Sequence, residues 1–170
     1  MITVRRELAG DAEAVRRVLL AAFETAAEAD LVERLRDGAD EYLAWVALDG
    51  DALVGHVAFT PLTLDGAACD GMGLAPLAVA PSHQRRGVGG ALVRAGLAAM
   101  RESGCSFVAL LGHPDYYPRF GFVPASRYGL RSAQWPDAPD DVVMAAVLDH
   151  ARMPAHGGAL RYLPAFDALD

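Results

Sequence analysis

The 170-residue chain contains no lysine and no asparagine, and all 15 of its basic residues are arginine. A Walker-type nucleotide loop needs a lysine to bind the phosphates, so the missing lysine excludes that kind of site. The two cysteines, Cys69 and Cys105, are too few and too far apart for a disulfide framework or a structural zinc site. We interpret each as a small buried side chain and expect no metal ion.

The chain also lacks long apolar runs, basic tracts and an apolar leader at its N-terminus. Its apolar runs are far shorter than a membrane span, and residues 1–6 contain no hydrophobic region of the secretory type. We therefore expect a cytoplasmic protein that binds neither a membrane nor nucleic acid. The net charge of −7 weakly favours a cationic substrate such as an amine.

A hydrophobic fraction of 53% is enough for a sizeable core, and we expect one domain over residues 1–170. The hydrophobic period changes repeatedly between that of a helix and that of a strand. The order of elements predicts an α/β fold, with a mixed sheet of about seven strands and helices on both faces. The predicted strands are 2–6, 43–48, 53–60, 72–79, 107–111, 142–148 and 160–163; helices are predicted near 11–24, 28–37 and between Gly90 and Gly104, and 124–141 is predicted to be loop.

The most informative segment joins an apolar strand to the helix that follows it. Gly87, Gly89 and Gly90 lack a Cβ, so main-chain amides there can approach phosphate oxygens closely. The first N–H groups of a helix have no partner within the helix, and the helix dipole is positive at that end. Arg85 and Arg86 add positive charge. The segment predicts an anion site, and the alternative interpretation is a tight turn that binds no ligand.

Two motifs carry a resemblance to a known family. The sequence QRRGVG at residues 84–89 is similar to the Q/R-x-x-G-x-G/A motif of the GNAT superfamily of N-acetyltransferases. The sequence YYPRFGF at residues 116–122 resembles the family's Y-x-x-x-G-F segment, with Tyr117 in the tyrosine position. A helix and a strand are predicted between the motifs, in the family's order. The resemblance covers most of the chain and is densest over residues 72–122.

The resemblance implies a GNAT fold and the transfer of an acetyl group from acetyl-CoA, as cosubstrate, to an amine by direct attack in a ternary complex. In the family, the fourth strand binds the pantetheine arm of the coenzyme through its backbone, and the glycine-rich loop binds the pyrophosphate. No metal is required. The coenzyme-binding residues implied here are Leu77, Ala78, Val79, Gln84, Arg85, Arg86, Gly87, Val88, Gly89, Gly90 and Tyr117.

Three residues are candidates for the chemistry. By resemblance, Tyr117 is the proton donor to the departing thiolate, with Tyr116 as the alternative. The amide of Leu77 is our candidate for stabilising the oxyanion. His113, at the end of a predicted strand, is our candidate base, and a hydrogen-bonded loop histidine is the alternative. Leu110 stands where many members of the family have an asparagine that contacts pantetheine, so that contact is in doubt.

The sequence is compatible with more than one acceptor and more than one function. The first choice of acceptor is a small-molecule amine, and the second is a protein N-terminus or lysine. A CoA-binding sensor or interaction module without catalysis is an alternative from another class, and a structural domain without a coenzyme is a third. A homodimer is also kept open.

Overall fold

Residues 1–169 are described by the structure, a computed structural model. The chain divides into two units, the first comprising residues 1–59, 75–96 and 165–170 and the second residues 60–74 and 97–164. The single domain therefore stays a prediction. Among residues 1–169 no helix is long and apolar enough to cross a membrane.

Nine strands are hydrogen-bonded within the described chain, in the order β1-β2-β3-β4-β5-β8-β6, while β9 pairs with both β3 and β7. The pairs β4·β5 and β7·β9 are parallel, and β1·β2, β2·β3, β3·β9, β5·β8 and β6·β8 are antiparallel. The strands are β1 (Ile2–Arg6), β2 (Leu43–Asp49), β3 (Ala52–Leu64), β4 (Ala67–Val79), β5 (Phe107–Leu111), β6 (Val123–Pro124), β7 (Leu130–Ser132), β8 (Val143–Val147) and β9 (Gly158–Arg161), and the α-helices are α1 (Ala12–Ala22), α2 (Ala27–Gly38) and α3 (Val88–Glu102).

The predicted mixed α/β sheet is confirmed, with nine strands instead of about seven. The added strands β6 and β7 are short, and β7 lies inside the segment 124–141, which was predicted to be loop. Its pairing with β9, which is distant in the sequence, stabilises β7, and a local composition rich in Pro and Asp gives no sign of it. The predicted start of α3, after Gly90, was also wrong, because the helix begins at Val88 and already includes Gly89 and Gly90.

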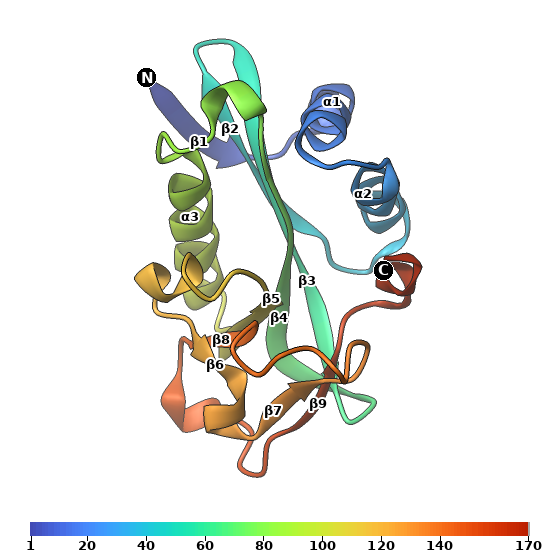
Figure 1. Cartoon of the computed structure of the whole chain (residues 1–170), viewed down its shortest axis with the longest axis vertical. Helices are drawn as coiled ribbons and strands as arrows, with labels where there is room; N and C mark the ends of the chain where they lie inside the picture. The colour runs from blue at the N-terminus through green and yellow to red at the C-terminus, as the bar shows by residue number, and fades with distance from the viewer. Residues whose placement is uncertain (170) are drawn as a thin grey trace. The chain divides into compact units, whose positions relative to one another are not determined.

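In the first unit, α1 and α2 cover one face of the strands, and the front of α3 covers the other (Figure 1). Val15 and Leu19 of α1, Val32 of α2 and Val46 of β2 are buried together on the first face. Burying each such side chain stabilises the folded state by about 1.5–3 kcal/mol. The apolar spacing along both helices therefore sets which face lies on the sheet.

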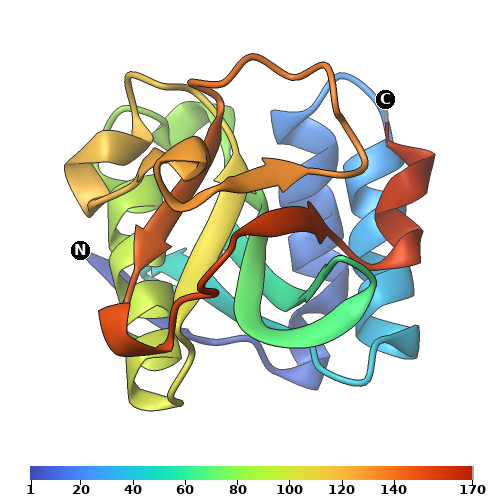
Figure 2. The ribbon, with the colours of Figure 1, turned by 90° about the horizontal axis from the view of Figure 1, so that it is seen from below.

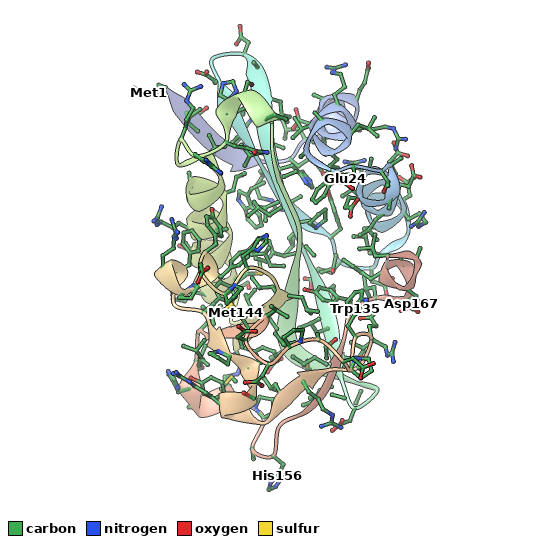
Figure 3. The ribbon with its side chains drawn as sticks, viewed as in Figure 1. Met1, Glu24, Trp135, Met144, His156 and Asp167 are labelled. Atoms are coloured by element: carbon green, nitrogen blue, oxygen red, sulfur yellow. The ribbon has the colours of Figure 1, made fainter. Side chains whose placement is uncertain are left out.

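In the second unit, β5 lies between β4 and β8, and the β5·β8 pair is visible in Figure 2. Met144 of β8 is fully buried, while His156 lies at the tip of the connection from β8 to β9 (Figure 3). β5 is apolar throughout and buried along nearly all of its length, so its side chains offer no polar group to a ligand.

A buried polar cluster in the first unit joins the residue just after β1 with β3 and α2. Glu7, whose side chain is 7% exposed, accepts a hydrogen bond from Arg36 at 2.8 Å and one from the Tyr42 hydroxyl at 3.3 Å. The Nε2 atom of His56 lies 3.0 Å from that hydroxyl and 3.4 Å from Glu7 Oε1. Burial alone would raise the pKa of Glu7, but the hydrogen bonds from His56 and Arg36 outweigh burial and lower it to about 2.

Replacement of Glu7 with glutamine is expected to destabilise the protein, because it leaves the partly buried Arg36 guanidinium without its carboxylate. We expect a loss of about 2 kcal/mol, which corresponds to a fall in Tm of roughly 5 °C in a chain of this size. Thermal unfolding followed by circular dichroism measures it. Glu13→Gln, which removes an exposed i,i+4 pair with Arg17, is the matched control and should change Tm little.

The same cluster predicts how stability depends on pH. The folded pKa of Glu7 lies below its unfolded value of about 4.3, so its contribution is complete above about pH 4.3 and is lost toward pH 2. Burial lowers the pKa of His56, so below about pH 6.5 the unfolded state binds a proton that the folded state does not. Denaturant unfolding at a series of pH values should show stability falling from pH 6.5 downward. A stability that is flat down to pH 3 would contradict both assignments.

Candidate active site

The segment between β4 and α3 forms a narrow turn in the first unit. A 3₁₀ turn, Pro81–His83, follows the strand, and α3 then begins at Val88. The Gly87 carbonyl accepts the first helical hydrogen bond, from the Ala91 amide at 3.0 Å. The N–H groups of the residues just after Gly87 therefore have no partner in the helix, and they point along its positive end.

Two residues of this turn have left-handed backbones. Arg85 has φ +62° and Gly87 has φ +83°. Left-handed backbone is uncommon in a residue other than glycine, and where it occurs it often marks a functional site. Alternation of right- and left-handed residues makes a concave set of N–H groups that suits an anion. Arg85 and Arg86 are exposed beside it, so they are available to an anionic ligand.

Side chains on both sides hold this turn in place. The Gln84 amide donates to the Val79 carbonyl at 3.0 Å, which closes the turn onto the end of β4. His83 is hydrogen-bonded to Ser82 Oγ at 2.8 Å and to Asp49 Oδ2 at 2.9 Å, which attaches the turn to the end of β2. Val88 is buried behind the first turn of the helix. The side chains of Gln84 and His83 thus have a structural use that the motif alone did not reveal.

The backbone of β4 orients the predicted pantetheine contacts. The Ala80 amide donates to the Val54 carbonyl of β3 at 2.8 Å. Since N–H groups alternate between the two edges of a strand, those of Val79 and Leu77 point away from β3 and that of Ala78 points toward it. The Ala78 side chain is buried against α1 and α2. Leu77 and Val79 therefore offer main-chain donors, whereas Ala78 serves the core.

In the second unit, Tyr117 begins a short 3₁₀ turn, Tyr117–Phe120, that ends at Gly121. Tyr117 is 9% exposed, and its ring packs edge-on against Tyr116 at 5.0 Å and Phe122 at 5.7 Å between ring centroids. Burial and the neighbouring Tyr116 raise the pKa of Tyr117 to about 12. Tyr117 is thus a rigidly placed phenol that keeps its proton at neutral pH.

The other predicted residues of the second unit differ in how they are placed. The His113 carbonyl accepts hydrogen bonds from the amides of Tyr116 at 3.1 Å and Tyr117 at 3.4 Å, so His113 and Tyr117 are brought together through the backbone. The His113 residue is exposed to solvent. Leu110, at the family's asparagine position, is buried in β5 and has no polar side-chain atom to offer a ligand.

The cysteines do not form a site. Cys105 is buried, as expected, and donates to the Phe107 carbonyl at 3.0 Å. Cys69 is only partly buried, contrary to expectation, because it lies near the exposed start of β4. Burial raises the pKa of both thiols, so neither is an activated nucleophile. Among residues 1–169 no group of three or more His, Cys, Asp or Glu side chains could hold a metal ion.

The sequence does not predict the role of one buried tyrosine in the second unit. Tyr162, just after β9, is buried, and its hydroxyl lies 3.2 Å from the Leu74 carbonyl and 3.4 Å from the Ala109 carbonyl. A tyrosine at the end of a short strand gives no sign of these partners, since β9 is far from both β4 and β5 along the chain.

The mixed sheet and the anion-suited turn before α3 fit an acyltransferase that uses an acyl-CoA. A family model described as the acetyltransferase (GNAT) domain matches residues 3–125. The uncharacterized N-acetyltransferase YhbS of Escherichia coli (strain K12) is 38% identical over 134 residues, which are 78% of this chain and 80% of YhbS. The chain belongs to the GNAT family of N-acetyltransferases, and the expected family and enzyme class are confirmed.

Solved structures agree with this assignment. The crystal structure of Escherichia coli YhbS in complex with CoA has a TM-score of 0.92 at 33% identity and covers 99% of this chain and 93% of its own. A GNAT family acetyltransferase from Brucella melitensis in complex with acetyl-CoA has a TM-score of 0.81 at 33% identity, covering 98% and 99%. The expected GNAT fold is therefore confirmed.

Replacement of Gly87 with valine is expected to weaken CoA binding by at least about tenfold, because a side chain at φ +83° is strained and would stand among the amides that face the ligand. No described protein atom lies within 4 Å of a Cβ placed there, so a clash within the protein is not the cause. Isothermal titration calorimetry with CoA measures the effect.

The matched control for this experiment is Gly50→Val in the β2–β3 turn. Gly50 also has a positive φ, +62°, and no described atom within 4 Å of a Cβ. This control should lower Tm by a similar amount and leave CoA affinity unchanged. Equal losses of affinity in both variants would show that the Gly87 effect reports stability and not the binding turn.

Proposed function

We propose that this GNAT protein transfers the acetyl group of acetyl-CoA to a primary amine of a small molecule, by direct attack in a ternary complex. The observation that carries the proposal is the turn at the front of α3, whose N–H groups have no partner within the helix and which has two left-handed residues and adjacent exposed arginines. The CoA and acetyl-CoA complexes of the two similar structures support it.

In this proposal the turn binds the pyrophosphate of the coenzyme. The N–H groups of Val88, Gly89 and Gly90 donate to phosphate oxygens, where the helix dipole also favours negative charge. Arg85 and Arg86 neutralise part of the charge from the rim. Arg85 and Arg86 are exposed, and the chain has no lysine. These arginines therefore supply the positive side-chain charge at the turn in this proposal.

The main chain of β4 holds the arm and stabilises the reaction. The amides of Leu77 and Val79, which point away from β3, are the proposed donors to the pantetheine arm and to the thioester carbonyl. When the amine attacks, negative charge grows on that carbonyl oxygen. The hydrogen bond from a fixed amide is stronger to this charged oxygen than to the neutral carbonyl of the bound thioester. The amide therefore stabilises the transition state more than the substrate, and this accelerates acyl transfer.

Tyr117 is the proposed donor to the departing sulfur. With a pKa of about 12 the phenol stays protonated throughout the working pH range. It is a weaker acid than a thiol of pKa ~8.5 by roughly 3 pK units, so full transfer to a free thiolate is unfavourable. Tyr117 therefore acts first as a hydrogen-bond donor whose bond strengthens as the carbon–sulfur bond breaks and charge gathers on sulfur.

The acceptor must be a neutral amine when it attacks, so its proton must leave. His113 stays the proposed base, and its exposure lets it pass that proton directly to water. The net charge of −7 favours an amine that arrives as a cation. The small-molecule acceptor, the cytoplasmic location and a homodimer all stay predictions.

Release of free CoA thiol from acetyl-CoA, measured with a panel of small amines and with peptides that contain a free N-terminus or a lysine, tests the acceptor class. Turnover with small amines is the expected result. Turnover only with peptides would replace the small-molecule acceptor with a protein, and tight coenzyme binding without any turnover would favour a CoA-binding sensor.

Replacement of Tyr117 with phenylalanine keeps the packed ring and removes the donor. We expect kcat to fall about 10- to 100-fold, while the Kd for acetyl-CoA changes far less. Steady-state kinetics and calorimetry separate the two quantities. Tyr116→Phe is the comparison, because Tyr116 lies edge-on to Tyr117. A larger fall in kcat for Tyr116→Phe would assign the donor to Tyr116 instead.

A further inference from the structure

The parallel pairing of β4 with β5 ends abruptly in the second unit. The register runs Gly71↔Phe107, Met72↔Val108 and Gly73↔Ala109. The register does not continue to Leu74 and Leu110, and Leu110 pairs instead with Met144 of β8. β4 itself continues as far as Val79. Within the described chain the pairing of β4 with β5 is not continued beyond Gly73, so the main chain of β4 that follows can take another partner.

The Tyr162 hydroxyl lies at the point where the pairing ends. It is 3.2 Å from the Leu74 carbonyl of β4 and 3.4 Å from the Ala109 carbonyl of β5, so one O–H proton is shared between acceptors on two strands. Burial, with a smaller effect of Tyr117, raises the pKa of Tyr162 above its ordinary value, so this hydroxyl remains a donor.

The surroundings fix the ring of Tyr162 at this point. The ring lies over Gly73, where an added Cβ would be 2.3 Å from its Cε1 atom. The Tyr162 amide donates to the Gln134 side chain at 2.7 Å, and Trp135 packs edge-on against the ring at 6.2 Å. The ring therefore has little freedom to move its hydroxyl away from the two carbonyls.

We propose that Tyr162 is a positioning residue that sets where β4 and β5 separate, and so keeps the main chain of β4 beyond Leu74 free for the pantetheine arm. This rests on the proposed coenzyme function, in which that stretch of β4 holds the arm. Tyr162 does so with a single hydroxyl, which satisfies carbonyls of both strands in place of direct pairing between them.

Tyr162→Phe tests the proposal, because it keeps the ring and removes only the hydroxyl. Two ligands are titrated by calorimetry, CoA and adenosine 3′-phosphate 5′-diphosphate, the part of CoA without the pantetheine arm. We expect CoA affinity to fall about tenfold, as befits the loss of a buried donor, and affinity for the nucleotide fragment to stay unchanged. The KM for acetyl-CoA should rise more than kcat falls.

Two controls separate positioning from stability. Tyr128→Phe removes a hydroxyl of the same kind from the second unit, where the ring instead contacts His150, and should leave both affinities unchanged. Gly73→Ala displaces the Tyr162 ring while keeping its hydroxyl and should reproduce the selective loss of CoA affinity. Gly71→Ala, also in β4, displaces the Phe107 ring instead and should lower Tm without that selectivity.

The outcomes distinguish this inference from the function on which it rests. If the unaltered protein binds neither ligand, the proposed coenzyme function fails. If it binds both and Tyr162→Phe weakens both equally, Tyr162 only stabilises the fold and the inference is wrong. Unchanged CoA affinity in a folded Tyr162→Phe protein overturns it as well, with Gly73→Ala as the second measurement should Tyr162→Phe fail to fold.

Discussion

The proposed activity depends first on main-chain N–H groups at the front of α3 that have no partner within the helix. Such groups are strong donors only while the turn before them is rigid, because a flexible turn would fold back and satisfy them itself. Here Gln84 ties the turn to the end of β4, the His83–Asp49 hydrogen bond ties it to β2, and buried Val88 anchors the helix behind it. The side chains of His83, Gln84 and Val88 thus keep the turn rigid, while the donors themselves are main-chain N–H groups.

A second constraint acts on β4. It needs hydrogen bonds to neighbouring strands to remain a strand, but its main-chain groups must be free of those strands where they bind a ligand. The amide of Ala80, just past the end of β4, donates a hydrogen bond to β3. Earlier residues of β4 are paired with β5 over three positions. The Ala80 bond therefore fixes the direction of the main chain just before it, in the first unit. A donor such as the Leu77 amide gains its effect from that fixed direction, since it does not have to reorganise when charge develops on the substrate.

The sequence predicts those parts of the protein whose signals are local. The pattern of apolar residues predicted β1, β5, α1 and α2 closely, because each of these elements shows its own pattern within a few residues. The glycine-rich turn was also found from local residue types. The buried cluster was not, since Glu7 meets Arg36 and His56 across long stretches of chain, and neither was Tyr162. Strand β7 was missed for the same reason, as its pairing with β9 is remote in sequence.

The acid–base properties of Tyr117 follow from its packing and limit what it can do. Burial among aromatic rings raises its pKa to about 12, so the same environment that places the hydroxyl also makes it reluctant to give up a proton. An unburied phenol, of pKa ~10, would also keep its proton at neutral pH, so burial serves mainly to fix the place of the hydroxyl. A buried phenol donates a hydrogen bond that strengthens only as negative charge appears on sulfur, so its contribution is confined to the transition state. Burial of this ring is therefore part of its proposed chemistry, because it fixes where the hydroxyl lies when charge gathers on sulfur.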